Sequence, residues 1–229
     1  KTSITGGVAG SLARLGHSVL CIDMDIGLRN LDISLGLSDR ALMDFSDVAE
    51  GRCPLVRAAV NHPDLPGLAL LTAPMTLSPA LTEEAVRRML DTARSLYDYV
   101  LIDSPAGLGA GFRMACCGAD RAIVVSTNDA SSLRDAQRTV GELDFLRQIH
   151  LVMNRIQPKL LRQLRTTIDD AMDTAGLPLL GVVPEDPQVM LSANLGRPLI
   201  LGGRQGAANA CLNIAKRLEG RRVPIMRIR

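Results

Sequence analysis

Charged and hydroxyl side chains at three places in the sequence are of the types that bind phosphate and a divalent metal. The chain begins with Lys1-Thr2, and in a phosphate-binding loop such a lysine reaches the terminal phosphates while the hydroxyl holds magnesium. Asp23 and Asp25 follow one apolar run, and Asp103 follows another. Because ligands of open parallel sheets bind beyond the carboxyl ends of the strands, these acids would lie beside a phosphate-bound metal.

Each of these signals also has an ordinary structural explanation. A Lys-Thr dipeptide alone is weak, and Asp23 and Asp25 fit solvated loop acids. Successive side chains of a strand point to opposite faces, so only one of these two acids is expected to face a nucleotide. Asp103 fits a plain strand-end carboxylate. The prediction of a nucleotide site therefore depends on the three signals occurring together.

A glycine-rich segment at residues 107–111 offers a rival interpretation. Its sequence, GLGAG, follows an apolar run and is similar to a dinucleotide-binding fingerprint. In that fingerprint a third glycine stands three positions after the second, where it lets the helix pack closely. This chain has Phe112 at that position, so nicotinamide or flavin binding is not expected.

The elements that must position these residues are predicted from alternating apolar and helical patterns. Strands are predicted at residues 18–22, 68–71, 99–102, 122–126, 150–153 and 179–183, and helices at residues 5–15, 82–96, 133–146 and 160–175. This alternation predicts an α/β fold, a doubly wound and mostly parallel sheet with helices on both faces, in a single domain of residues 1–229.

A phosphate loop normally lies between a first strand and a first helix, whereas this chain opens on a predicted helix. We therefore expect the first strand to be missing from the sequence. Its neighbours in the sheet would then expose unpaired edges.

The composition of the chain argues against several classes of partner and location. A net charge of +2 and an aromatic content of 2% argue against a specific nucleic-acid partner. The sequence has no run of eighteen apolar residues to span a bilayer and no secretory signal, so the expected compartment is the cytosol. The five cysteines lack metal-ligand spacing and are expected to be reduced core residues: Cys21, Cys53, Cys116, Cys117 and Cys211.

Five segments occur in the order and spacing of a known family. The chain resembles the MinD/ParA family of deviant Walker A ATPases over almost its whole length, in residues 23–37, 97–108, 118–127, 151–155 and 181–199. Residues 27–32, GLRNLD, are the most specific and are typical of the septum-site-determining MinD members. Relatives that partition DNA or control flagellar number share the strand-end acids but usually differ at these letters.

The resemblance implies roles for the residues that bind phosphate and metal. Lys1 would be the phosphate-binding lysine, Thr2 a magnesium ligand, and Ser3 a further contact to the nucleotide. Asp25 would be the switch acid that positions the attacking water, at the edge of the magnesium site. Asp103 would be the second switch acid, near magnesium.

The resemblance also implies where the base binds. Asn154 would recognise the adenine edge, because an amide offers both a donor and an acceptor. Arg155 and the loop of Pro184, Glu185 and Asp186 would form the walls of the adenine pocket.

The activity that the resemblance implies is hydrolysis of ATP to ADP and phosphate with Mg²⁺, slow without a partner. ATP would close a homodimer, which binds the anionic inner-membrane surface through a C-terminal helix and recruits the division inhibitor MinC, until MinE or another spatial regulator triggers release. The protein would thus be cytoplasmic and peripheral on the inner face of the membrane. Two alternatives are a DNA-segregating or flagellar-number ATPase, and a non-catalytic interaction protein that lost its phosphate loop.

The chain departs from the family pattern in three places, and each departure affects a binding function or activity that the resemblance implies. The KGGxG segment and its strand are absent, including a lysine that reaches across the dimer, so the chain alone is expected not to bind ATP tightly. Gly109 stands where many members have an acid, which affects the details of partner-triggered hydrolysis. The basic tail, residues 221–229, is interrupted by Pro224, so the membrane helix is expected to be absent too.

Overall fold

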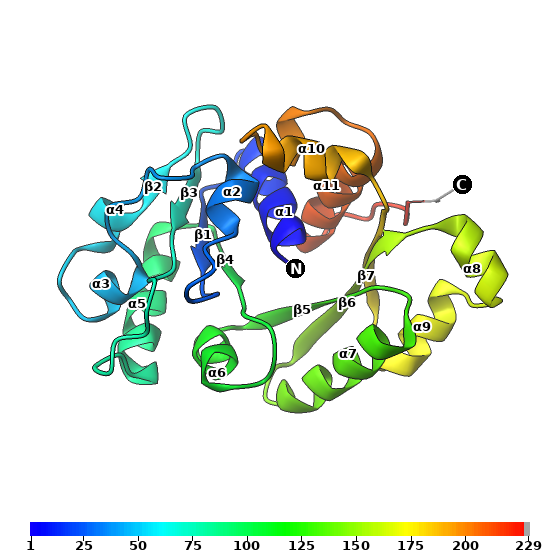
Figure 1. Ribbon diagram of the computed structural model, residues 1–229, viewed down its shortest axis with the longest axis horizontal. Coiled ribbons are helices and arrows are strands. Elements are labelled where there is room, and N and C mark those ends of the chain that lie inside the picture. The colour runs from blue at the N-terminus through cyan, green and yellow to red at the C-terminus, as the bar shows by residue number, and fades with distance from the viewer. Residues whose placement is uncertain (227–229) are drawn as a thin grey trace. The chain divides into compact units, whose positions relative to one another are not determined.

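The computed structural model describes residues 1–226, which divide into two compact units (Figure 1). The first unit comprises Lys1–Gly118 and Val189–Gly202, and the second comprises Ala119–Gln188 and the chain from Gly203 onward. The single domain predicted from the sequence stays a prediction, because a division into compact units does not test it.

The first unit contains a sheet of four strands in the order β2-β3-β1-β4. β1 (Val19–Asp23) runs parallel to β3 (Leu68–Leu71) and to β4 (Tyr99–Asp103), whereas the short β2 (Val60–Asn61) is antiparallel to β3. The helices of this unit are α1 (Thr2–Arg14), α2 (Leu31–Leu35), α3 (Phe45–Ala49), α4 (Leu55–Ala58), α5 (Glu83–Leu96), α6 (Ala110–Cys116), the 3₁₀ turn η1 (Leu199–Leu201) and most of α10 (Pro187–Asn194).

The alternation of side chains along β1 decides which helices cover each face of this sheet. Leu20 and Ile22 belong to the apolar cluster that also contains Phe45 of α3 and Leu90 of α5. Asp23 is one residue further along and therefore points to the opposite face. On that face α1 packs against β1, β3 and β4. The acids at the strand ends are thus directed toward the helix that begins with Thr2.

The second unit contains three parallel strands in the order β5-β6-β7. They are β5 (Arg121–Ser126), β6 (Gln148–Ile156) and β7 (Leu179–Pro184), with helices α7 (Ala130–Glu142), α8 (Pro158–Leu164), α9 (Ile168–Ala175) and α11 (Gly206–Leu218). α11 packs on β7, so closely that a Cβ on Gly181 would collide with Ile214. α7 and α9 lie against the other side of the sheet (Figure 1).

Several boundaries differ from the sequence prediction. The helix predicted at residues 160–175 is wrong as a single element, because Arg165 adopts a left-handed φ of 52° and Thr167 caps a new helix, α9. The helix predicted at residues 133–146 begins at Ala130 and ends at Glu142. The antiparallel β2 was not predicted, and the described strands form two sheets where one was expected.

The mostly parallel pairing and the flanking helices confirm the predicted α/β class. β4 is an edge strand of the first sheet and β5 an edge strand of the second within residues 1–226. Residues Tyr99 to Ile102 of β4 are only half-buried, as is usual at a sheet edge.

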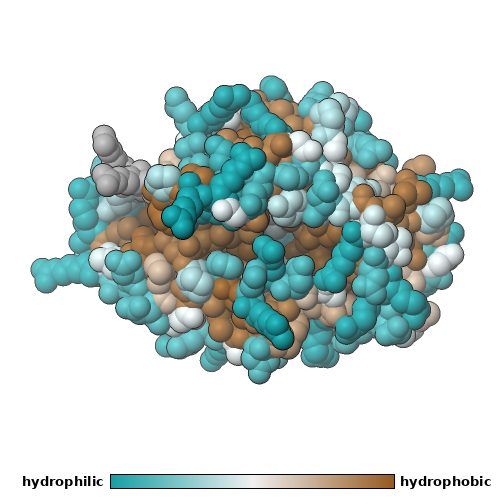
Figure 2. All heavy atoms as spheres, turned by 180° about the vertical axis from the view of Figure 1, so that it is seen from behind, coloured by the Kyte–Doolittle hydropathy of each residue, from teal (hydrophilic) through white to brown (hydrophobic). Residues whose placement is uncertain are grey.

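The surface and the tail add three findings. Viewed from behind, polar side chains cover much of the surface and apolar residues show between them (Figure 2). Within residues 1–226 no helix is long and apolar enough to cross a membrane. The described part of the tail, up to residue 226, is not helical, and Arg227 and Arg229 lie outside the described residues.

All five cysteines are free. Cys21, Cys53 and Cys211 are buried, as predicted. Cys116 and Cys117 are only partly buried, because they lie at the C-terminal end of the short helix α6, so the prediction of core positions is wrong for these two.

Candidate functional site

Two buried carboxylates lie side by side where β1 and β4 end. Asp23 and Asp103 are partners in the strand register, and their exposed fractions are 1% and 2%. Asp23 Oδ1 accepts a hydrogen bond from the Asp25 N–H at 2.9 Å, and Oδ2 accepts one from the Leu31 N–H at 3.1 Å. Asp23 thus holds both ends of the loop that carries Asp25.

Electrostatics and hydrogen bonding act against each other at Asp23. Burial raises the pKa of this carboxyl, and the neighbouring charges of Asp103 and Asp25 raise it further. The backbone hydrogen bonds from Asp25 and Leu31 lower the pKa. Of the two acids weighed in the sequence, Asp23 is the structural one, whereas Asp25 is half-exposed.

Asp103 is bound by the first two turns of α1. The Thr5 hydroxyl donates to Asp103 Oδ1 at 3.2 Å, and the Thr2 hydroxyl also hydrogen-bonds this carboxylate. Burial raises the pKa of Asp103, while the hydrogen bond from Thr2, that from Thr5 and the charge of Lys1 lower it. Sequence reasoning missed Thr5, because the interaction spans 98 residues and no motif marks it.

Lys1 contacts the loop that follows Asp103. Its Nζ donates to the Pro105 carbonyl oxygen at 2.6 Å. Burial lowers the pKa of the Lys1 ammonium, and the charges of Asp103 and Asp25 raise it. The structure therefore brings Lys1, Thr2 and Asp103 together, with Asp25 close enough to act on Lys1 electrostatically.

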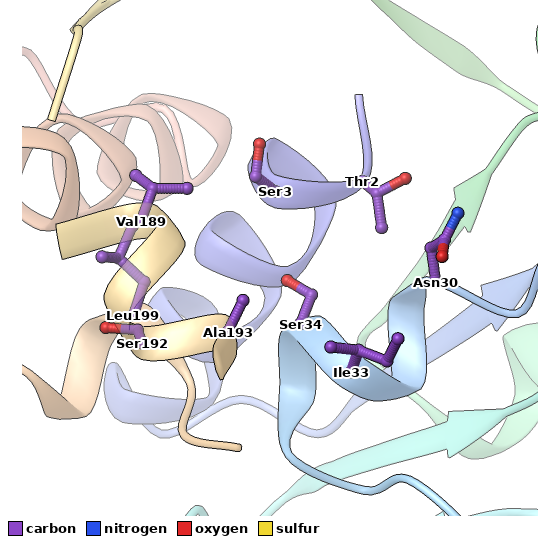
Figure 3. Close-up of a pocket in the computed structure, with 9 residues that line it drawn as sticks. All are labelled: Thr2, Ser3, Asn30, Ile33, Ser34, Val189, Ser192, Ala193 and Leu199. Atoms are coloured by element: carbon purple, nitrogen blue, oxygen red, sulfur yellow. The ribbon is translucent and has the colours of Figure 1, made fainter. Parts of the chain in front are cut away.

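A pocket of about 240 Å³ adjoins this group of residues (Figure 3). Thr2 and Ser3, on the first turn of α1, form one wall. The remaining lining comes from Asn30, Ile33 and Ser34 at α2 and from Val189, Ser192, Ala193 and Leu199 in the segment of α10 and η1. Ser3 thus lines a mixed hydroxyl and apolar cavity. The α10 side of this cavity was not predicted, since its small residues resemble ordinary helix packing.

The residues expected to bind a base lie in the second unit, at the ends of β6 and β7. Arg155 adopts a left-handed φ of 56°, and its Nε donates to Glu185 Oε2 at 2.8 Å. The Glu185 N–H donates to the Ile156 carbonyl oxygen at 3.1 Å. Asn154 precedes Arg155 in β6, and Pro184 precedes Glu185 at the end of β7, so the structure brings the end of β6 and the predicted loop together.

Asp186 has a structural task in addition. Its Oδ1 accepts from the Gln188 N–H at 2.9 Å and its Oδ2 from the Ala207 N–H at 2.8 Å, near the starts of α10 and α11. Gly206 has a left-handed φ of 52°, and a Cβ there would collide with Asp186 Oδ2. Because both carboxylate oxygens are engaged, Asp186 shapes its loop by fixing the following backbone.

The oxygen ligands at the end of β4 fit magnesium. Among residues 1–226 no group of three or more His, Cys, Asp or Glu side chains could hold a metal ion by itself. Magnesium does not require such a group, because it keeps several waters and binds through one or two carboxylates plus substrate phosphates. The Thr2 hydroxyl and the Asp103 carboxylate, which hydrogen-bond each other, are donors of this kind.

Comparison with known proteins identifies relatives of this chain. Residues 1–199 match the family model described as the CobQ/CobB/MinD/ParA nucleotide binding domain. The septum site-determining protein MinD of Synechocystis is 37% identical over 231 residues, covering 99% of this chain and 87% of the relative. MinD of Bacillus subtilis is 38% identical, covering 98% of this chain and 86% of the relative.

Solved structures give the same result. The MinC:MinD cell division protein complex of Aquifex aeolicus matches with a TM-score of 0.92 and 35% identity, over 99% of this chain and 93% of that chain. MinD of Pyrococcus horikoshii, complexed with Mg-ADP, matches with a TM-score of 0.83 and 25% identity, over 95% of this chain and 90% of that chain. The predicted α/β fold, with a mostly parallel sheet flanked by helices, is confirmed as that of a P-loop NTPase, and the chain belongs to the MinD family of septum site-determining proteins, within the CobQ/CobB/MinD/ParA nucleotide-binding domain family.

Proposed function

We propose that this protein is an ATP-hydrolysing switch that cycles on and off the membrane during division-site selection. A role in division-site selection follows from membership of the MinD family. The observation that carries the finer proposal is the group of Lys1, Thr2 and Asp103, in which a cation, a hydroxyl and a buried carboxylate meet at the end of a parallel strand.

In the proposed reaction, water attacks the terminal phosphate of ATP in line and gives ADP and phosphate. The Lys1 ammonium binds the terminal phosphates, and Asp25, on its half-exposed loop, orients the attacking water. Thr2 and Asp103 hold magnesium, which neutralises charge on the phosphates when bound. Catalysis is then mainly positioning and charge stabilisation. Asp23 contributes to the positioning, because its two backbone hydrogen bonds fix the loop that presents Asp25.

For the base, we propose that Asn154 binds the adenine edge through its amide. The ion pair between Arg155 and Glu185 supports this, because it connects the end of β6 with the loop after β7 within their unit. Pro184 and Asp186 keep that loop rigid, the former by its ring and the latter by its two backbone hydrogen bonds.

The partners are proposed on the same basis. The Aquifex relative forms a complex with MinC, and we propose MinC as the partner that this protein recruits. An ATP-dependent homodimer, a C-terminal segment that binds the anionic inner-membrane surface, and release triggered by MinE or another spatial regulator complete the cycle. The protein would divide its time between cytoplasm and membrane.

Sedimentation with anionic liposomes tests this proposal. The natural full-length protein should pellet with liposomes in Mg·ATP and remain in solution in Mg·ADP. MinC should pellet only when this protein and Mg·ATP are both present. Equal sedimentation with both nucleotides would contradict the cycle. Retention on DNA that falls steeply with salt, without liposome binding, would support a DNA-segregating ATPase instead. Nucleotide-independent binding of MinC would support the non-catalytic alternative.

A further inference from the structure

Thr5 differs from other threonines in the helices of this protein in what its hydroxyl contacts. Thr92 in α5, Thr139 in α7 and Thr174 in α9 each donate to the carbonyl oxygen four residues earlier in the same helix, at 3.0, 2.8 and 2.8 Å. Such a bond within the same helix is common for threonine. Thr5 instead donates across to Asp103 Oδ1 at 3.2 Å.

The position of Thr5 on α1 suits this contact. Thr5 follows Thr2 by three residues, so the two side chains lie on one face of the helix, one turn apart. Both hydroxyls bond the carboxylate of Asp103, which is 2% exposed. A β-branched side chain in a helix has few χ1 choices, so a threonine at this position presents its hydroxyl in a restricted set of directions.

A contact of Lys1 also restricts the segment that follows β4. Lys1 Nζ binds the Pro105 carbonyl oxygen, two residues beyond Asp103. Lys1 and Thr2 are the residues assigned to the phosphates and the metal, so their contacts to this segment must adjust when a nucleotide is present. Thr5 has no such assignment. It is therefore the residue of α1 whose bond to Asp103 can persist in every state of the cycle.

We propose that Thr5 is a positioning residue, which fixes the orientation of the Asp103 carboxylate so that its oxygens present a preformed ligand to the magnesium of a bound nucleotide. This inference rests on the proposed function, in which Asp103 lies at the magnesium site. Thr5 touches neither nucleotide nor metal and acts through Asp103. Its removal should weaken the contribution of magnesium to nucleotide binding and leave metal-free nucleotide binding unchanged.

Calorimetric titration of the natural full-length protein with ADP, once with Mg²⁺ and once with EDTA, measures that contribution directly. The variants are Thr5→Val, which keeps the shape and removes the hydroxyl, Thr5→Ser, which restores the hydroxyl, and Thr92→Val as the matched control in α5. The ratio of the two affinities should fall roughly tenfold in Thr5→Val, the size expected for a hydrogen bond to a charged group. It should be restored in Thr5→Ser and be unchanged in Thr92→Val.

Two results would overturn the inference. One is a Thr5→Val protein, folded by its thermal transition, whose affinity ratio equals that of the wild type. The other is a Thr5→Ser protein as impaired as Thr5→Val, which would assign the effect to packing of the methyl group. If the wild type binds ADP in neither condition, the proposed function itself fails. That outcome differs from the first two, in which the wild type binds and only the variants decide.

Discussion

Substitution of the buried His62 is expected to lower stability by an amount that depends on which ring nitrogen is replaced. Its Nε2 lies 3.0 Å from the Leu35 carbonyl oxygen at the end of α2, so the proton is on Nε2. Its Nδ1 accepts from the N–H groups of Asp64 and Leu65, at 3.0 and 3.1 Å. The side chain therefore connects α2 with the turn before β3.

The size of the effect follows from these three bonds. His62→Ala removes all of them, and at about 1 kcal/mol each the free energy of unfolding should fall by about 3 kcal/mol. For a chain of this size that lowers the melting temperature by roughly 6–12 °C. His62→Asn places a carbonyl oxygen near the position of Nδ1, as in an Asx turn, so only the bond to Leu35 is lost, costing about 1 kcal/mol.

The pH dependence has a definite sign. Burial lowers the pKa of His62 below its usual 6.5 and the charge of Arg40 lowers it too, while the bond to Leu35 and the charge of Asp64 raise it. Between the lowered pKa and 6.5 the unfolded chain binds a proton that the folded protein does not. The contribution of His62 is therefore complete above pH 6.5 and is lost as the pH falls toward the folded-state pKa.

Thermal unfolding of wild type, His62→Ala and His62→Asn between pH 7.5 and 5 checks both points. His62→Asn should show a shallower loss of stability on acidification than the wild type, because the asparagine side chain does not titrate. Equal slopes for wild type and His62→Asn, or a His62→Ala protein as stable as wild type at pH 7.5, would refute this account of His62.

Three further predictions concern glycine and carboxylate positions. Gly206→Ala should destabilise the protein by more than about 1 kcal/mol, because φ is 52° and the methyl group would collide with Asp186, whereas Gly141→Ala, in open space within α7, should raise the melting temperature. Asp129→Asn should flatten the loss of stability on acidification, because hydrogen bonds from Ser131, Thr127 and the Ser132 N–H lower the pKa of Asp129 from 3.8 to about 2. That carboxylate stabilises the fold above pH 3.8, and its contribution is lost as the pH falls to about 2. Asp23→Asn should lower the free energy of unfolding by about 1–3 kcal/mol, because the side-chain amide has one oxygen and cannot replace both carboxylate oxygens as acceptors for the Asp25 and Leu31 N–H groups. Thermal unfolding followed by circular dichroism measures the change in each of these variants.

The parallel strands were predictable because buried strands leave continuous apolar runs. Residues 68–71 match β3 fully, and the run at 99–102 lacks only Asp103. Features set by single backbone angles were not predictable. The break at Arg165 separates α8 from α9 inside a stretch of unbroken helical spacing, and β2 has two residues, too few for any pattern.

In the candidate site, too, the residues that belong to motifs were predictable and the contacts that depend on tertiary packing were not. Lys1, Thr2 and the strand-end acids follow motifs, so the sequence alone placed them at one edge of the sheet. The separate tasks of Asp23 and Asp25 depend on which carboxylate meets the N–H of Leu31, eight residues away in the chain. The contact of Thr5 with Asp103 depends on how α1 packs across the sheet, and no local pattern records that packing.

The residues at the ends of β1 and β4 are proposed to hydrolyse Mg·ATP, and the rate of phosphate release by the natural full-length protein tests this proposal most directly. The wild type should release phosphate only with Mg²⁺, and Asp25→Asn should retain Mg·ATP binding while its rate falls by roughly a hundredfold, as expected when a group that orients the attacking water is removed. No phosphate release from the wild type, or an Asp25→Asn rate equal to that of the wild type, would contradict the account.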